Sequence, residues 1–123
     1  MSNEQNGGRY NVLLDKSFTF GVRVFKLGRY LQRQQHEFVV AKQVTRCGTS
    51  IGANAEEATG AISKAEFSQK ISIAYKEARE TSYWLRLLRA ADCLPEPLFS
   101  SLHDDCQELC KILYAILRSS GRT

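Results

Sequence analysis

The fold is decided by the stretch Arg46-Cys-Gly-Thr-Ser-Ile-Gly-Ala-Asn-Ala-Glu-Glu-Ala58. Most of its residues are small, and its apolar residues recur at helical spacing, which predicts a helix that another helix approaches closely. A glycine inside a helix costs roughly 1 kcal/mol against alanine, and tight contact at Gly48 and Gly52 would offset that cost. After a break at residues 59–62, Ser63-Lys-Ala-Glu66 has the pattern of a capping box. We therefore expect a helical hairpin on which the remaining chain packs.

Apolar residues spaced three and four apart predict a long helix on each side of this hairpin as well. The four predicted helices cover residues 17–34, 37–58, 64–91 and 97–119. Because the links between them are short, the predicted fold is all-α, an antiparallel up-down-up-down four-helix bundle. We expect residues 1–14 to form a flexible N-terminal segment, residues 15–120 the bundle, and residues 121–123 a C-terminal tail.

Composition favours a single soluble domain without metal or cofactor. The chain has 123 residues, of which 43% are hydrophobic and 24% charged, with a net charge of +4. The sequence has no signal peptide, no apolar run long enough for a membrane, and no Cys-x-x-Cys motif. We expect a cytoplasmic protein with reduced, buried thiols at Cys47, Cys93, Cys106 and Cys110.

Candidate chemistry is weak. His36 and His103 have no glutamate three residues before them, as a di-metal bundle site requires, so no metal or cofactor is expected. Neither a nucleophile with an adjacent base nor a phosphate-binding glycine loop is recognisable. The sequence therefore predicts a protein that is not an enzyme, with no catalytic residues.

The first predicted helix has more apolar surface than one bundle can bury. Besides its core seam, it carries a second seam formed by Phe18, Val22 and Phe25. That seam needs another partner, either the N-terminal segment or another subunit. We expect these three residues, together with Trp84 on the third helix, to form an oligomer interface.

A polar stripe follows the flank of the second helix. Because the second and third helices are antiparallel, equal distances from their turn place Arg46 beside Glu77 and Glu80. We predict that Arg46 pairs with one of these carboxylates or bridges both, as guanidinium geometry allows. Such a polar network would fix the helix register, although a subunit contact is an alternative use. Its expected members are Arg46, Asn54, Glu57, Glu77 and Glu80.

Two basic faces are the candidates for binding a partner. No acidic residue occurs between Lys16 and Gln35, and on the third helix basic residues alternate with Tyr75 and Tyr83. Positive charge with interleaved aromatic rings suits the phosphates and bases of RNA or DNA. The expected nucleic-acid-binding residues are Arg23, Lys26, Arg29, Arg33, Lys76, Arg79 and Arg86.

Several blocks of the chain resemble a known family. They are Lys16-Ser17, residues 43–58, Ser63-Lys-Ala-Glu-Phe67 and residues 73–88. These blocks are similar to four-helix-bundle proteins encoded in intervening sequences of bacterial large-subunit ribosomal RNA genes. The resemblance covers about Lys16 to Ser119. One departure is Cys47, where that family would lead us to expect serine.

The resemblance implies a four-helix fold and a ring-like homo-oligomer, expected to be a pentamer. The family is related to the accessory variability proteins of diversity-generating retroelements. For that retroelement branch, the resemblance also implies binding to nucleic acid and to a reverse transcriptase. This chain is more similar to the intervening-sequence branch, whose biochemical role is undefined.

Two functional hypotheses follow. The first is a non-enzymatic, homo-oligomeric adaptor that binds nucleic acid, or an enzyme acting on nucleic acid, through its basic faces. The second is a purely structural, self-assembling bundle that binds no nucleic acid. Retention of nucleic acid at low salt distinguishes them, since phosphate contacts weaken steeply as salt rises.

Overall fold

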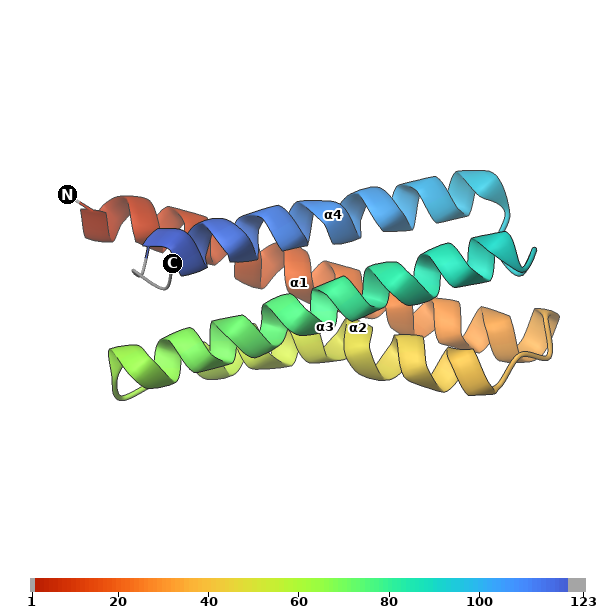
Figure 1. Ribbon diagram of the computed structural model, residues 1–123, viewed down its shortest axis with the longest axis horizontal. Coiled ribbons are helices and arrows are strands. Elements are labelled where there is room, and N and C mark those ends of the chain that lie inside the picture. The colour runs from red at the N-terminus through yellow and green to blue at the C-terminus, as the bar shows by residue number, and fades with distance from the viewer. Residues whose placement is uncertain (1, 120–123) are drawn as a thin grey trace.

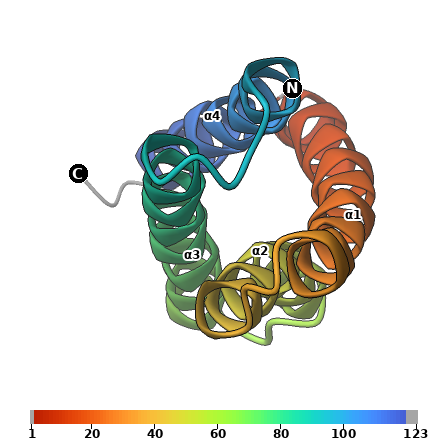
Figure 2. The ribbon, with the colours of Figure 1, turned by 90° about the vertical axis from the view of Figure 1, so that its right-hand side faces the viewer.

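The computed structural model of the protein describes residues 2–119, with side chains from Tyr10 onward. Within that range the chain forms the helices α1 (Ser2–Gln34), α2 (Val39–Ala58), α3 (Lys64–Ala90) and α4 (Glu96–Ser119). Successive helices run antiparallel (Figure 1). Seen from one end, they surround a common core in chain order (Figure 2). The predicted all-α, up-down-up-down bundle is confirmed.

The beginning of α1 differs from the prediction. The helix begins at Ser2 instead of near residue 17, so it continues through the segment expected to be flexible. Its early turns contact the bundle: Leu13 is fully buried, and the Tyr10 hydroxyl donates a hydrogen bond of 2.8 Å to the Ala55 carbonyl. These contacts offset the helix cost of Gly7 and Gly8. The predicted tail at residues 121–123 lies outside the described residues.

Side chains at the helix ends account for the bounds of α2 and α3. The Val40 amide donates to a Glu37 carboxylate oxygen at 2.6 Å, which caps α2. The Glu66 amide donates to the Ser63 hydroxyl at 3.0 Å, and the Glu66 carboxylate accepts from the Ile62 amide at 3.1 Å. The Ser63 half of the predicted capping box is therefore present at the start of α3, whereas the Glu66 carboxylate reaches back to the residue before the N-cap.

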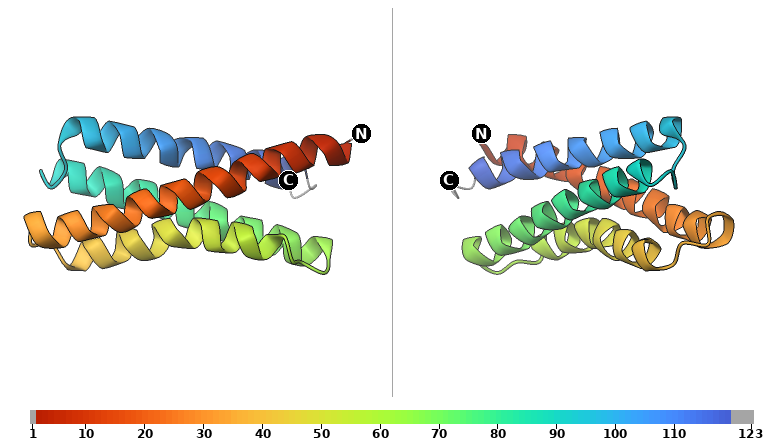
Figure 3. Two further views of the ribbon diagram at one scale, coloured as in Figure 1. Left: turned by 180° about the vertical axis from the view of Figure 1, so that it is seen from behind. Right: turned by 45° about the vertical axis from the view of Figure 1, so that its right-hand side comes forward.

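Helices α1 and α2 approach each other closely where the sequence places small residues, and Figure 3 shows α1 running along α2. A Cβ atom added at Gly48 would lie 2.6 Å from Cγ1 of Val24, a fully buried residue of α1. One added at Gly52 would lie 3.3 Å from the Ser17 carbonyl oxygen. The predicted close contact at both glycines is confirmed.

The core consists mainly of the apolar residues spaced three and four apart along the four helices, joined by Leu13 from the segment expected to be flexible and Leu94 from the α3–α4 turn. Its largest fully buried side chains include Phe20, Leu31, Ile51, Leu85 and Leu113. All four cysteines are free, and three are buried; Cys93, predicted to be buried, is partly exposed in the turn after α3. Across residues 2–119, none of the helices combines the length and apolar character that a membrane crossing requires.

Candidate assembly and nucleic-acid surfaces

An apolar face on α1 is left uncovered by the other residues that the structure describes. Phe18, Val22 and Phe25, which we call the apolar face, are 73%, 41% and 53% exposed. The N-terminal segment continues α1 in a straight line, so it does not fold back over them (Figure 1). Of the two partners expected for this seam, the N-terminal segment from Ser2 onward does not cover it.

A groove lies directly beside the apolar face, between α1 and α2. It has a volume of about 290 Å³ and is lined mainly by the apolar face together with small residues, among them Gly21, Gly52 and Ala53. Because no large side chain fills this groove, a complementary apolar side chain could enter it. A groove of this kind next to exposed phenylalanines is typical of a protein–protein contact.

Trp84 does not belong to the apolar face. It lies half-buried on α3, and within the described residues the backbones of α1 and α3 make no close approach, since the two helices lie diagonally across the bundle (Figure 2). Its indole N–H donates to a Glu80 carboxylate oxygen at 3.0 Å, and its ring meets Tyr83 edge-on at 5.1 Å. The four residues predicted to share one interface therefore lie on two separate surfaces.

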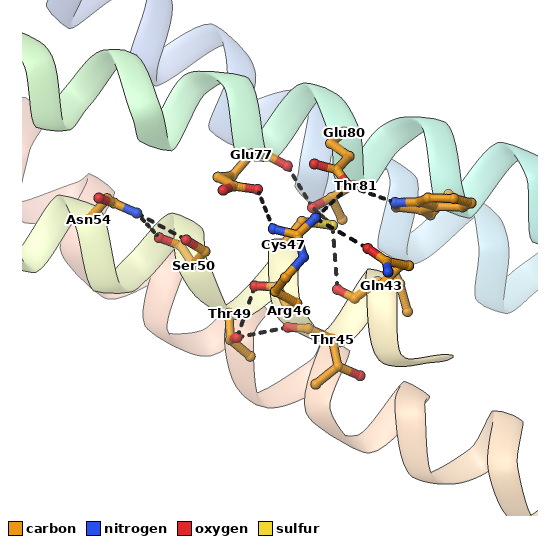
Figure 4. Close-up of polar contacts among 12 residues, drawn as sticks. Gln43, Thr45, Arg46, Cys47, Thr49, Ser50, Asn54, Glu77, Glu80 and Thr81 are labelled. Carbon is orange, nitrogen blue, oxygen red and sulfur yellow. Dashed lines mark hydrogen bonds and ion pairs between the residues drawn. The ribbon is translucent and has the colours of Figure 1, made fainter. Parts of the chain in front are cut away.

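Arg46 lies between the two carboxylates predicted as its partners (Figure 4). Its guanidinium is 3.3 Å from a Glu77 oxygen and 2.6 Å from a Glu80 oxygen. It also lies 3.5 Å from the amide oxygen of Gln43. The antiparallel register of α2 and α3 thus brings the expected groups together.

This network lies at the surface. The Arg46 side chain is 50% exposed, so its ion pairs are in contact with solvent. Hydrogen bonds from Trp84 and Arg46 lower the pKa of Glu80, and the hydrogen bond with Glu80 raises the pKa of Arg46. Exposed ion pairs contribute only about 0–1 kcal/mol each, so we expect a modest effect on stability.

Two other predicted members of the network are separate from it. The Asn54 amide donates to the carbonyl and hydroxyl oxygens of Ser50 at 2.9 and 3.0 Å (Figure 4). The Glu57 carboxylate lies 2.7 Å from the Lys70 ammonium. The polar stripe is therefore not one network. Each of its side chains contacts the polar group nearest to it, and these contacts are independent of one another.

Part of the predicted basic face of α1 is neutralised by α4. The Arg23 guanidinium lies 2.7 Å from an Asp105 oxygen, and the Lys16 ammonium lies 3.3 Å from a Glu108 oxygen. These ion pairs join the two helices along their shared edge. Arg23, a predicted nucleic-acid contact, is thus already engaged within the bundle.

The other residues of α1 that were predicted to bind nucleic acid lie in the C-terminal part of the helix. Lys26, Arg29 and Arg33 line one open hollow of about 440 Å³ together with Tyr30 and Gln34. We call Lys26, Arg29 and Arg33 the basic end. Among residues 2–119, none of the three forms an ion pair with a carboxylate. Positive charge is favourable near a helix C-terminus, but three unpaired cations exceed what the helix dipole alone requires.

The basic residues predicted on α3 are distant from the basic end. Helix α3 lies across the bundle from α1 (Figure 2). The Arg79 guanidinium lies 5.8 Å from the ring centre of Tyr75 and donates to its hydroxyl at 3.0 Å, which raises the pKa of Arg79. Arg86 lies 6.0 Å from the ring centre of Tyr83, and Lys76 is exposed on the same helix. The two predicted sets therefore form two surfaces instead of one.

Sequence reasoning missed the contribution of α4 to the α3 surface. Lys111, Tyr114 and Arg118 follow one another at spacings of three and four outside the core seam, a signal that could have been recognised. The Tyr114 ring lies 6.0 Å from that of Tyr75, and Arg118 lies 5.8 Å from the Tyr114 ring centre.

A contact between a serine and a histidine was also missed, because the two residues lie on different helices. The Ser82 hydroxyl and His103 Nε2 are 2.9 Å apart, and the His103 ring stacks on Phe99. Burial, with the nearby charge of Arg86, lowers the pKa of His103. Because Ser82 lies on α3 and His103 on α4, the contact links these two helices. The described residues also contain no group of three side chains suited to hold a metal ion.

Comparison with known proteins agrees with this architecture. The model of the 23S rRNA-intervening sequence protein family matches residues 10–115. The chain belongs to that family. Among solved structures, it is similar to a protein of unknown function from the S23 ribosomal protein family of Bacteroides thetaiotaomicron, with 44% identity and a TM-score of 0.88. That match covers 89% of this chain and 98% of the other. No match was found among curated proteins.

Proposed function

We propose that the protein is a non-enzymatic, homo-oligomeric adaptor that binds nucleic acid through its basic surfaces. The observation that carries this proposal is the basic end, where Lys26, Arg29 and Arg33 converge on one open hollow without carboxylate partners. Cations that are free of internal ion pairs are available to phosphates and to the release of counterions. Tyr30 in the same hollow offers a ring to a base or sugar.

Assembly is the second half of the proposal. The apolar face on α1 and the adjoining groove supply a surface that a second copy would cover. A ring, with five subunits as the number expected from the family resemblance, would repeat the basic end once per subunit. Repetition raises the effective affinity of weak sites for one long polyanion.

The proposed cellular compartment and protein partner follow from the cysteines and from the family resemblance. Four free cysteines fit a reducing compartment, and we place the action of the protein in the cytoplasm. The resemblance to the accessory variability proteins of retroelements implies a reverse transcriptase as the protein partner. An adaptor that holds nucleic acid beside such an enzyme needs no catalytic group of its own.

Fluorescence anisotropy with labelled RNA and DNA over a salt series tests the proposal. Affinity should fall steeply as salt rises. Arg29→Gln/Arg33→Gln should make the negative slope of log K against log salt shallower by up to about 2. The matched control is Lys64→Gln/Lys70→Gln, which removes the same charge from the first turns of α3, at the opposite end of the bundle from the basic end. Equal effects of both pairs would assign binding to net charge alone. Absence of binding at low salt would leave a purely structural assembly.

A further inference from the structure

The side of the bundle formed by α3 and α4 carries two neighbouring tyrosines, each flanked by an arginine. The rings of Tyr75 and Tyr114 lie 6.0 Å apart with an interplanar angle of 41°. Arg79 and Arg118 each lie 5.8 Å from the ring centre of their own tyrosine, four residues away on the same helix. We call these four residues the tyrosine–arginine face.

Charge on this face is positive because nearby carboxylates are engaged on other sides of the bundle. Residues 72–79 of α3 contain one carboxylate, Glu77, which contacts Arg46 on α2. Residues 107–118 of α4 also contain one, Glu108, which contacts Lys16 on α1. Lys111 adds another exposed cation to α4. An anionic partner would therefore meet no opposing carboxylate within these two stretches.

The geometry of the arginines adds to this picture. The Arg79 guanidinium is held beside the Tyr75 ring by its 3.0 Å hydrogen bond to the tyrosine hydroxyl. A base stacked on a tyrosine would thus have a guanidinium within reach of its own phosphate. Guanidinium groups bind phosphate oxygens in a bidentate manner, and aromatic rings stack on bases of any sequence.

A second copy of the chain is a poor occupant of this face. Two such faces brought together would place like charges opposite each other. The apolar surface suited to a subunit contact lies across the bundle, on α1 and α2 (Figure 2). Assembly through the apolar face would therefore leave the tyrosine–arginine face open to solvent.

We infer that the tyrosine–arginine face binds single-stranded nucleic acid by stacking a base on Tyr75 and Tyr114 while Arg79 and Arg118 contact the flanking phosphates. This inference rests on the proposed function and narrows its ligand. A duplex keeps the faces of its bases stacked inside the helix, so it can use the cations but not the rings. Single strands should therefore bind more tightly than duplex of equal length.

Anisotropy titrations with three labelled probes test this inference: oligothymidine, oligouridine and a mixed-sequence duplex, each of about 20 nucleotides per strand. The variant is Tyr114→Leu, which removes an exposed ring but keeps apolar bulk. Tyr75→Leu is the second variant. Tyr114→Phe keeps the stacking ring, and Phe38→Leu removes an exposed ring in the α1–α2 link, outside the tyrosine–arginine face.

We expect Tyr114→Leu and Tyr75→Leu to weaken single-strand binding by about 5- to 150-fold, the loss of one stacked base. Duplex binding should stay unchanged, and Tyr114→Phe and Phe38→Leu should bind as the wild type does. Comparison of oligothymidine with oligouridine tells DNA from RNA. A bromouracil-containing strand should photocrosslink to α3 or α4 peptides that contain the paired tyrosines.

Two results would overturn the inference, and they differ in what they leave standing. If strands and duplex bind equally and neither leucine variant changes either, the face does not stack bases, while nucleic-acid binding by the basic end remains. If no probe binds at low salt, the proposed function fails and this inference fails with it. Circular dichroism of each variant checks that it is folded as the wild type is.

Discussion

The α1–α2 side and the α3–α4 side of this bundle have opposite characters. Between α1 and α2, small residues let the backbones approach, and phenylalanines and a shallow groove are left outside. Between α3 and α4, tyrosines and arginines project outward in pairs. The α1–α2 side therefore suits contact with another apolar protein surface, and the α3–α4 side suits an anionic ligand.

This difference shows that the chemical type of the side chains left outside the core, and not only their number, indicates what a surface of the bundle can bind. An apolar surplus costs free energy in water and favours association, whereas a cationic surplus keeps a surface hydrated and open. In a ring built through the first surface, the second would be presented repeatedly.

The first prediction removes the apolar character of α1. Phe18→Ser/Phe25→Ser should weaken self-association by about 100- to 10,000-fold, because each buried phenylalanine contributes about 1.5–3 kcal/mol. Sedimentation velocity at micromolar concentration measures the effect. The control is Ile62→Ser, which removes a hydrophobic side chain that is 93% exposed in the α2–α3 turn. Identical association of the double variant and the wild type would remove the apolar face from the interface.

The second prediction concerns the close contact beneath that surface. Gly48→Ala should lower the free energy of unfolding by about 1–3 kcal/mol, since its Cβ would meet the buried Val24 side chain at 2.6 Å. Gly21→Ala is the matched control on α1, where the nearest atom is 3.9 Å away. That variant should be neutral or gain up to about 1 kcal/mol of helix propensity. Chemical denaturation of both variants gives the comparison, and equal stability of the two would contradict the tight packing.

The third prediction uses pH to probe the interior between α2 and α3. Burial raises the pKa of Cys47 to about 11, and its sulfur accepts a 3.1 Å hydrogen bond from Thr81. The unfolded thiol ionises near pH 8.5, so its contribution to stability is complete below that pH and is lost as pH rises towards 11.

Wild-type stability should therefore fall, relative to Cys47→Ser, by on the order of 2 kcal/mol between about pH 9 and pH 11. Denaturation curves of the two proteins at each pH isolate this thiol from the tyrosines and lysines, which titrate in both. Parallel pH profiles would mean that Cys47 is accessible to solvent.

The fourth and smallest effect is expected at the α2–α3 network. Arg46→Met should cost about 1 kcal/mol or less, because the guanidinium is half exposed and its two ion pairs are partly screened. The loss should shrink at high salt. Thermal unfolding at low and high salt measures both. A salt-independent loss of several kcal/mol would instead indicate a buried charge left without its partner.

The sequence was sufficient for contacts set by local spacing. The bounds of α2, α3 and α4 agree with prediction within two residues, and the partners of Arg46 followed from the antiparallel register. The predicted start of α1 was wrong. The glycine pair and the polar residues of the N-terminal segment indicated a flexible tail, but Tyr10 and Leu13 contact the bundle and keep the segment helical. Those contacts depend on α2, so local propensity could not reveal them.

Contacts between helices that are not joined by a short turn were harder to predict. The pair Arg23–Asp105 and the rings of Tyr75 and Tyr114 depend on how α4 is placed against α1 and α3. The α1–α4 register has no connecting turn from which to count, and α4 was considered for its core seam alone. The cations of α1 were therefore treated as one set, although α4 neutralises Arg23.

The central claim is that copies of this chain cover each other's apolar face, and the mass of the wild-type protein tests it most directly. Sedimentation equilibrium should give a multiple of the 13.9 kDa chain mass at micromolar concentration, with five copies as the expected number. A single species of 13.9 kDa across the whole concentration range, with Phe18 and Phe25 left in water, would contradict the account.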